Sequence, residues 1–163
     1  MMQVRKAVMD DMERLMQLME AAREIMQSNG NPTQWADGYP QREVVERDIE
    51  QNHCYVCVDN GVVVGTFVFM PGPEPAYHQI EDGAWIDDKR PYYVVHRVAS
   101  TPESHGVFAA MMAFCGTHSH NIRIDTHRNN HIMRHCFQRH GFAYCGIVRV
   151  RNGEERLAYQ RME

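Results

Sequence analysis

A turn between a predicted strand and a predicted helix contains the residues whose pattern suggests ligand chemistry. The strand YYVVHRVA, residues 92–99, leads through STPESHG into an apolar helix predicted at 109–117. The first turn of a helix has backbone NH groups without partners and the positive end of the helix dipole. Gly106 allows the chain to turn closely at this point. The pattern favours a phosphate-binding turn, although most strand-to-helix turns bind nothing.

Ten histidines raise the question of a metal site. His131 and His135 are one helical turn apart in the predicted helix 130–140, and His127 precedes them, so imidazoles could converge on a zinc ion. No HExxH arrangement or carboxylate accompanies them, and histidines on helix surfaces are usually solvated. We therefore predict that the protein binds no metal.

The five cysteines do not form a short-spaced framework. Cys54 and Cys57 make a CxxC, but it lies in the alternating run HCYVCV, which is typical of a strand. A strand points residues three apart to opposite faces, which disfavours a redox or zinc pair. An odd number of cysteines in this pattern predicts reduced, mostly buried thiols.

Composition excludes several classes of protein. The 163 residues, 44% hydrophobic and 23% charged, predict a single globular domain over residues 1–163. A formal charge of −4 gives no general attraction for nucleic acid or for anionic membranes, so neither is an expected partner. No apolar run reaches the roughly 18 to 20 residues of a membrane helix, and the start MMQVRKAVMDDMERL is unlike a signal peptide, so we expect a cytoplasmic protein.

Hydrophobic periodicity predicts an alternation of strands and helices. The expected elements are a strand in 2–8, helices from about 11 to 29 and at 41–51, strands at 53–58, 62–70 and 92–99, a helix at 109–117, a strand at 121–126, a helix at 130–140, and strands at 142–150 and 155–161. Asp10 or Asp11 is expected to cap the first helix. Asn60-Gly61 and Asn152-Gly153 predict tight turns. Hairpins followed by βαβ units indicate an α/β fold, with a sheet of mixed direction covered by helices.

Two segments do not fit this periodicity. Residues 31–40, NPTQWADGYP, combine turn formers with aromatic residues, and Trp35 either lines a pocket or covers the core. Residues 71–91 contain Pro71, Pro73 and Pro75, which predict a long irregular stretch.

The order of elements and two local motifs resemble the GNAT superfamily of acyl-CoA N-acyltransferases over essentially the whole chain. In that family an R/Q-x-x-G-x-G/A turn holds the CoA pyrophosphate. Gly106 matches one glycine of this motif, whereas Phe108 stands at the second and Glu103 at the Arg/Gln position, or His105 at the Arg position in another register. The second signature is matched by DTHRNNHIMRHCFQRHGF, with Asn130 before a helix that ends in Gly141-Phe142.

The resemblance implies a GNAT-like α/β (α+β) fold, with a mixed, mostly antiparallel central sheet flanked by helices on both faces. It also implies acetyl-CoA as co-substrate, held by the end of the HRVAS strand, the following turn and the Asn of the second motif. The cofactor-binding residues implied in this way are Val98, Ala99, Ser100, His105, Gly106, Val107, Phe108, Ala109 and Asn130.

The activity implied by the resemblance is N-acetyl transfer to a primary amine of a small molecule or peptide, by direct attack in a ternary complex. His96 and His127 are the candidate general bases, because imidazole titrates near neutral pH; a packed structural histidine is the alternative for each. Asp125 could orient His127 or cap the following helix. The family's usual proton-donating Tyr is replaced by Phe137, which leaves Cys136, Tyr144 or water for that role.

The acceptor pocket is expected to be aromatic, with acidic residues of segment 71–91 either at its mouth or merely solvated. Its predicted substrate-binding residues are Trp35, Tyr39, Trp85 and Tyr93, with Tyr77 as a further lining residue. Two other interpretations remain open. One is a catalytically impaired GNAT-fold protein that binds CoA or another small ligand without turnover, which Phe108 and Phe137 favour. The other is a purely structural protein that forms a homodimer through edge strands, with the C-terminal strand AYQRM as the candidate edge.

Overall fold

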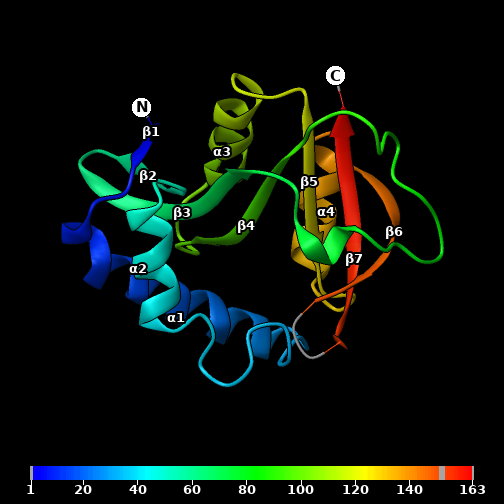
Figure 1. Ribbon diagram of the computed structural model, residues 1–163. Helices are drawn as coiled ribbons and strands as arrows, with labels where there is room; N and C mark the ends of the chain where they lie inside the picture. The colour runs from blue at the N-terminus through cyan, green and yellow to red at the C-terminus, as the bar shows by residue number, and fades with distance from the viewer. Residues whose placement is uncertain (1, 151–152, 163) are drawn as a thin grey trace.

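The computed structural model describes residues 2–150 and 153–162. Its strands and helices follow the predicted order, and Figure 1 shows them arranged as one open sheet with helices packed against it. The elements are β1 (Met2–Lys6), α1 (Met12–Ser28), α2 (Arg42–Glu50), β2 (Cys54–Asp59), β3 (Val62–Pro71), β4 (Tyr93–Ser100), α3 (Val107–Gly116), β5 (Asn121–Thr126), α4 (His131–Arg139), β6 (Ala143–Arg149) and β7 (Glu155–Met162). The fold is a mixed α/β structure, as the sequence predicted.

The sheet has the order β1-β2-β3-β4-β5-β7-β6, and only β4 and β5 pair in parallel. The prediction that AYQRM is an edge strand is wrong. These residues belong to β7, which pairs with β6 on one side and with β5 on the other, from Asn121–Met162 to Thr126–Leu157. Both backbone edges of β7 are therefore used inside the sheet, and β1 and β6 form its edges.

Two apolar clusters lie on opposite faces of the sheet. One contains Leu15 of α1 and Val45 of α2, and the other contains Met111 of α3 and Phe137 of α4. Gly65 of β3 permits the close approach of α3, since a Cβ there would lie 2.5 Å from a methyl group of Val107. The helices therefore cover both faces.

The cysteines are free, as predicted, and four of the five are buried. Cys54 belongs to the cluster under α1 and Cys57 to the cluster under α3, so the CxxC residues point to opposite faces. Burial raises the pKa of Cys57 to about 12, and burial likewise raises the pKa of Cys115 to about 12. These thiols are core residues and would be poor nucleophiles.

The helix ends show one side-chain cap that the sequence did not predict, at Asn130, whereas the predicted cap of the first helix by Asp10 or Asp11 is not formed. Asn130 precedes α4, and its side-chain oxygen accepts from the backbone NH of Met133 at 3.2 Å. Asp11 instead accepts from the backbone NH of Val8 at 2.8 Å and pairs with Arg5, because a 3₁₀ turn at Met9–Asp11 comes before α1. Asn152 of the predicted Asn152-Gly153 turn lies outside the described residues. Among the helices of the described residues, none is both long enough and apolar enough to span a membrane.

Strands β4 and β5 separate soon after they begin. They pair only at Tyr93–Ile122 and Val94–Arg123. Beyond this point β4 carries a bulge, because two residues, Arg97 and Val98, face one residue of β3, and Arg97 has a φ of 50°. The bulge bends β4 and interrupts its ladder with β3, so the sheet opens into a V between β4 and β5 (Figure 1).

The segment between β3 and β4 covers the part of the sheet that α1 and α2 do not reach. It is largely irregular, as predicted, but it includes a 3₁₀ turn at Pro75–Tyr77 and a bridge from Glu81 to Ile147 of β6. Tyr77 and Trp85 form a third buried cluster with residues of β4, β6 and β7. In Figure 1 the segment, drawn in green, runs past β7 and β6. Its order therefore comes from packing and not from local periodicity.

Candidate active site

A cavity of about 710 Å³ lies where β4 and β5 diverge. Its walls come mainly from segment 31–40, α2, β4, β5, α4 and residues 74–76, with further residues of α1, β3, β6 and β7. Five of the residues predicted to bind ligand or catalyse line this cavity: Trp35, Tyr39, His96, Val98 and Asn130. The cavity is large enough for a small substrate and the reactive end of a second one.

His96 and Glu74 face each other in the cavity. His96 lies on β4 one residue before Arg97 of the bulge, and its Nε2 is 3.0 Å from Oε1 of Glu74. Their side chains are 20% and 25% exposed, so the pair is shielded from water but reachable. The hydrogen bond with His96 lowers the pKa of Glu74 below its usual value, against the opposing effect of burial. This is a carboxylate–imidazole pair, an arrangement that suits proton transfer.

A second charged group closes another wall of the cavity. The Arg97 guanidinium donates to both carboxylate oxygens of Asp48 on α2, at 2.7 and 2.8 Å, and to the hydroxyl of Tyr39 at 2.9 Å. Because Asp48 is buried, the bidentate pairing removes the cost of an isolated charge. The three side chains connect β4, α2 and segment 31–40, and they fix the shape of the wall.

Asp125 on β5 lines the cavity in a role that the sequence did not predict. Its Oδ2 accepts a 2.6 Å hydrogen bond from Tyr77, so it neither orients His127 nor caps α4. Burial and the Asp125 carboxylate raise the pKa of Tyr77 well above its usual value. Tyr77 is therefore a neutral donor, and the sequence prediction that it lines the pocket is not met by its position in the third cluster.

The two predicted bases do not share this cavity. His127 follows β5, and its two ring nitrogens face Thr33 Oγ1 at 3.1 Å and the NH of Asn129 at 3.0 Å. Burial, helped by the nearby positive charge of Arg156, lowers its pKa. Among the described residues that line the cavity, His96 is included and His127 is not. The geometry thus favours His96 of the two.

Gln34 joins segment 31–40 to the turn between β5 and α4. Its Oε1 accepts from side-chain groups of Asn31, Thr126 and Asn130 and from the backbone NH of His127, at 2.9 to 3.3 Å. The carboxamide of Asn130 is therefore used twice, once to cap α4 and once to bond Gln34. Asn130 holds the two sides of the V together at this corner of the cavity.

The start of α3 has the features of an anion site. Gly106 precedes the helix with a φ of 76°, and a Cβ there would meet nothing within 4 Å. The NH groups of Val107, Phe108 and Ala109 have no backbone partner among the described residues. The Phe108 ring packs against Phe137 and His140, with centroids 6.0 and 5.1 Å apart. Free NH groups and open space beside Gly106 fit a phosphate group.

The other predicted cofactor-binding residues lie near this turn. Ala99 and Ser100 pair with Thr66 and Gly65 of β3, so they end β4 as regular strand residues, whereas His105 is exposed in the turn. The role of each in binding acetyl-CoA stays a prediction.

Trp85 and Tyr93 lie away from the cavity. The Trp85 ring contacts the Arg123 guanidinium at 4.0 Å, and Tyr93 stacks on Phe69 at 4.6 Å. Four acidic residues of the segment between β3 and β4 were expected at the mouth of the pocket or in solvent. They form ion pairs or hydrogen bonds with other residues: Glu81 with Arg149, Asp82 with Tyr144, Asp87 with Arg90, and Asp88 with Arg123. Of the groups considered as proton donors, neither Cys136 nor Tyr144 is among the described residues that line the cavity, whereas Phe137 is.

Sequence reasoning missed Glu74, Asp48 and Gln34. Glu74 stands between prolines in PGPEP, where a carboxylate is normally solvated, and Asp48 and Gln34 lie in an ordinary helix and loop. The only available signal was indirect, namely that Arg97 in an apolar strand needs a counter-charge.

Comparison with known proteins supports the fold assignment. No family model and no curated protein sequence matches the chain. Among solved structures, a GNAT-family acetyltransferase from Streptococcus agalactiae is 29% identical, with a TM-score of 0.90 over 99% of this chain and 95% of that one. A GNAT-family acetyltransferase from Listeria monocytogenes is 21% identical, with a TM-score of 0.68 over 99% and 95%. A ribosomal-protein-alanine N-acetyltransferase from Brucella melitensis is 14% identical, with a TM-score of 0.64 over 99% of both chains.

The two more distant structures share the fold, and the first also shares more than a quarter of its residues. The similarity to the first structure extends over nearly the whole length of both chains. The chain therefore has the GNAT fold, and the similarity to these acetyltransferases supports its membership of the GNAT superfamily.

Proposed function

We propose that the protein is an acetyltransferase that moves an acetyl group from acetyl-CoA to a primary amine of a small molecule or peptide, within a ternary complex. The observation that carries this proposal is the His96–Glu74 pair inside the cavity between β4 and β5. A histidine backed by a carboxylate beside a strand bulge provides a proton acceptor next to unpaired backbone groups. The acyltransferase fold supports the same reaction class.

In this reaction the residues of the chain would have the following roles. His96 accepts the proton of the attacking amine as the N–C bond forms and the C–S bond breaks. A backbone NH in the β4 bulge, at Arg97 or Val98, stabilises the negative charge on the carbonyl oxygen. The proton held by His96 then goes to the departing thiolate directly or through water, so an amine and an acetyl thioester become an amide and a thiol.

Acetyl-CoA fits the chain at two places. The NH groups that begin α3 and the open space beside Gly106 suit its pyrophosphate, which is the fit expected of a helix N-terminus. Val98 and Asn130 line the cavity and would flank the acyl end of the same molecule. When bound, it supplies the activated acetyl group.

A second candidate is a protein that binds CoA or another small ligand without turnover. Phe137 favours it, because this cavity-lining residue stands where the family usually has a proton-donating Tyr. Water or the protonated His96 would have to replace that hydroxyl in an active enzyme.

Calorimetric titration with acetyl-CoA, followed by thiol release with a panel of amines, tests both. We expect micromolar binding that Gly106→Trp abolishes, whereas Gly61→Trp, at another glycine of positive φ and open space, leaves it unchanged. Asn130→Ala should weaken binding more than Asn130→Asp, which retains the helix cap. Absence of binding would overturn the proposal, and binding without thiol release for any amine would favour the second candidate.

A further inference from the structure

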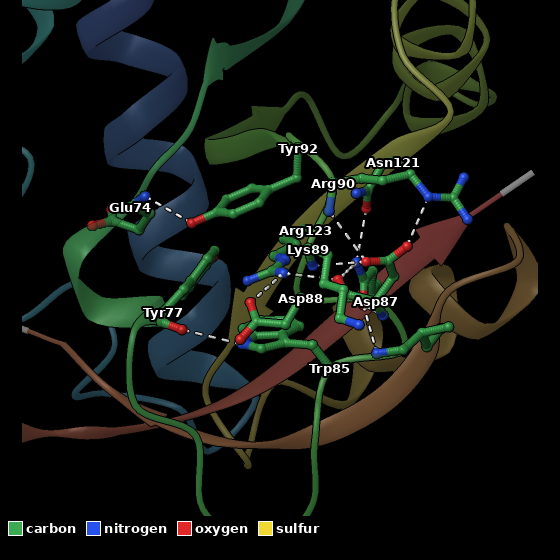
Figure 2. Close-up of polar contacts among 12 residues, drawn as sticks. Glu74, Tyr77, Trp85, Asp87, Asp88, Lys89, Arg90, Tyr92, Asn121 and Arg123 are labelled. Atoms are coloured by element: carbon green, nitrogen blue, oxygen red, sulfur yellow. Dashed lines mark hydrogen bonds and ion pairs between the residues drawn. The ribbon is translucent and has the colours of Figure 1, made fainter.

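Glu74 is held in place by the structure around it, although it lies in an irregular segment. Its backbone NH donates to the hydroxyl of Tyr92 at 2.9 Å, and its Oε2 accepts from the NH of Ala76 at 3.2 Å. Its remaining oxygen faces His96. Figure 2 shows the Tyr92 hydroxyl directed at the backbone of Glu74. Both the main chain and the side chain of Glu74 are thus fixed, and the side chain faces His96 in the cavity.

Tyr92 is in turn fixed by a buried cation. The Arg123 guanidinium lies 3.8 Å from the centroid of the Tyr92 ring and 4.0 Å from that of Trp85, and Arg123 is only 1% exposed. Desolvated cation–π contacts of this kind are stronger than exposed ones. The Tyr92 ring also packs against the backbone at Gly72, where a Cβ would come within 2.6 Å of it.

The same arginine holds the far end of the segment. Arg123 donates to the carbonyl of Asp87 and to the carboxylate of Asp88, each at 3.0 Å (Figure 2). Gln160 of β7 accepts from the NH of Ile86 at 2.8 Å and donates to the same carbonyl of Asp87. The segment is therefore fastened to β5 and β7 at one end and presents Glu74 at the other.

The contact with Glu74 has a direct consequence for His96. A carboxylate accepts a proton from Nε2, so neutral His96 carries its hydrogen there and leaves the lone pair on Nδ1. Nδ1 has no hydrogen-bond partner in residues 2–150 and 153–162. The other charged or titratable groups nearby are already paired: Arg97 with Asp48, and Tyr77, whose ring is 6.5 Å from that of His96, with Asp125.

We propose that Glu74 is a positioning residue that holds His96 in the Nε2–H tautomer, so that Nδ1 accepts the proton of the acceptor amine, and that Tyr92 on Arg123 sets the place of Glu74. The catalytic part rests on the proposed function, whereas the tautomer does not. The Glu74 carboxylate also stabilises the imidazolium formed when His96 takes up the proton.

The first experiment measures the tautomer without any substrate. Nitrogen-15 NMR of the His96 ring, assigned with His96→Gln, should show the Nε2–H form in the wild type at pH 8. Glu74→Ala should give a mixture of tautomers, and Glu74→Asp should restore part of the Nε2–H signal. An Nδ1–H form in the wild type, or an unchanged spectrum in Glu74→Ala, would overturn the proposal.

The second experiment separates positioning from binding. Glu74→Gln should lower kcat up to about a hundredfold and leave the KM for acetyl-CoA within about twofold, because general-base catalysis is worth about 10² to 10⁴. Tyr92→Phe keeps the ring on Arg123 but removes the hydroxyl, and should lower kcat about threefold to tenfold. The controls are Glu43→Gln on the exposed side of α2 and Tyr55→Phe in the core, which should leave kcat unchanged.

Each failure has a distinct signature. Unchanged kcat in Glu74→Gln would overturn the role of Glu74 in catalysis. If the wild type releases no thiol with any amine, the proposed function fails, and the NMR spectra alone still decide whether Glu74 orients His96.

Discussion

Segments 31–40 and 72–92 are both irregular and both carry a buried tryptophan, but they contribute to the cavity in opposite ways. The shorter segment lines the cavity along its length, through Gln34, Trp35 and Tyr39. The longer one lines it only at Glu74, Pro75 and Ala76, and its later residues pack on the sheet. In the short segment, the residues that line the cavity are also the ones that attach the segment to the rest of the protein. In the long segment, these two sets of residues are separate.

The difference follows from what each segment is attached to. Gln34 bonds residues at the end of β5, next to the cavity itself. Segment 72–92 is attached near the start of β5, through Arg123, where β4 and β5 still pair. An aromatic residue in a loop is therefore poor evidence of a pocket, because it serves equally well as the loop's anchor.

The largest effect should come from removing either tryptophan. Trp35→Ala and Trp85→Ala should each lower the free energy of unfolding by about 3 to 5 kcal/mol, because both rings are buried. Urea denaturation measures the loss. Only Trp85→Ala should also speed tryptic cleavage after Lys89, since the bond after Arg90 is protected by Pro91. Equal cleavage in both variants would show that the two segments are not anchored independently.

The second largest loss of stability should come from replacing the buried Arg123. Arg123→Met retains the side-chain volume but removes both aromatic contacts and the hydrogen bonds to Asp87 and Asp88, so we expect a loss of about 2 to 3 kcal/mol. The exposed Arg42→Met is the control in the same denaturation experiment. A loss no larger than that of the control would remove Arg123 as the anchor of segment 72–92.

A smaller effect is expected at the anchor of the short segment. Gln34→Leu leaves the side-chain donors of Asn31, Thr126 and Asn130 without this acceptor, at a cost of about 1 to 2 kcal/mol. Exposed Gln138→Leu should change the stability by less than about 0.5 kcal/mol. Similar stabilities for the two variants would contradict a role of Gln34 in joining the walls of the V.

The smallest effect concerns the stability of the protein at low pH. The pKa of Glu74 is lowered in the folded chain by the hydrogen bond from His96, so its stabilising contribution is present above the ordinary carboxyl value of 4.5 and is lost as the pH falls through the lower folded value. Glu74→Gln should flatten the fall of stability in that range by less than about 1 kcal/mol. Asp11→Asn is the positive control, since Arg5 lowers the pKa of Asp11. If the stability of Glu74→Gln fell more steeply with decreasing pH than that of the wild type, the prediction would be contradicted.

The sequence by itself determined the elements and their order. Apolar periodicity located β5 at its observed bounds and α1 within about a residue at each end, because these patterns depend on neighbours two residues apart in a strand and three or four apart in a helix. The start of α4 was likewise predicted to within one residue, although the cap was expected at Asp125 and is made by Asn130. The motifs around Gly106 and Asn130 led to the correct superfamily, because they too are local in the sequence.

Only the tertiary structure decided which side chains meet. Glu74 contacts His96 although the two residues are 22 positions apart in the sequence, and Asp48 contacts Arg97 across 49 positions. Both contacts depend on the bulge in β4 and on the divergence of β4 and β5, which no local pattern encodes. Tyr93 was predicted in the pocket and lies in the core, because the divergence of β4 and β5 begins just beyond it. Strand register and the point of separation are collective properties of the packed sheet, and they determine which groups share the cavity.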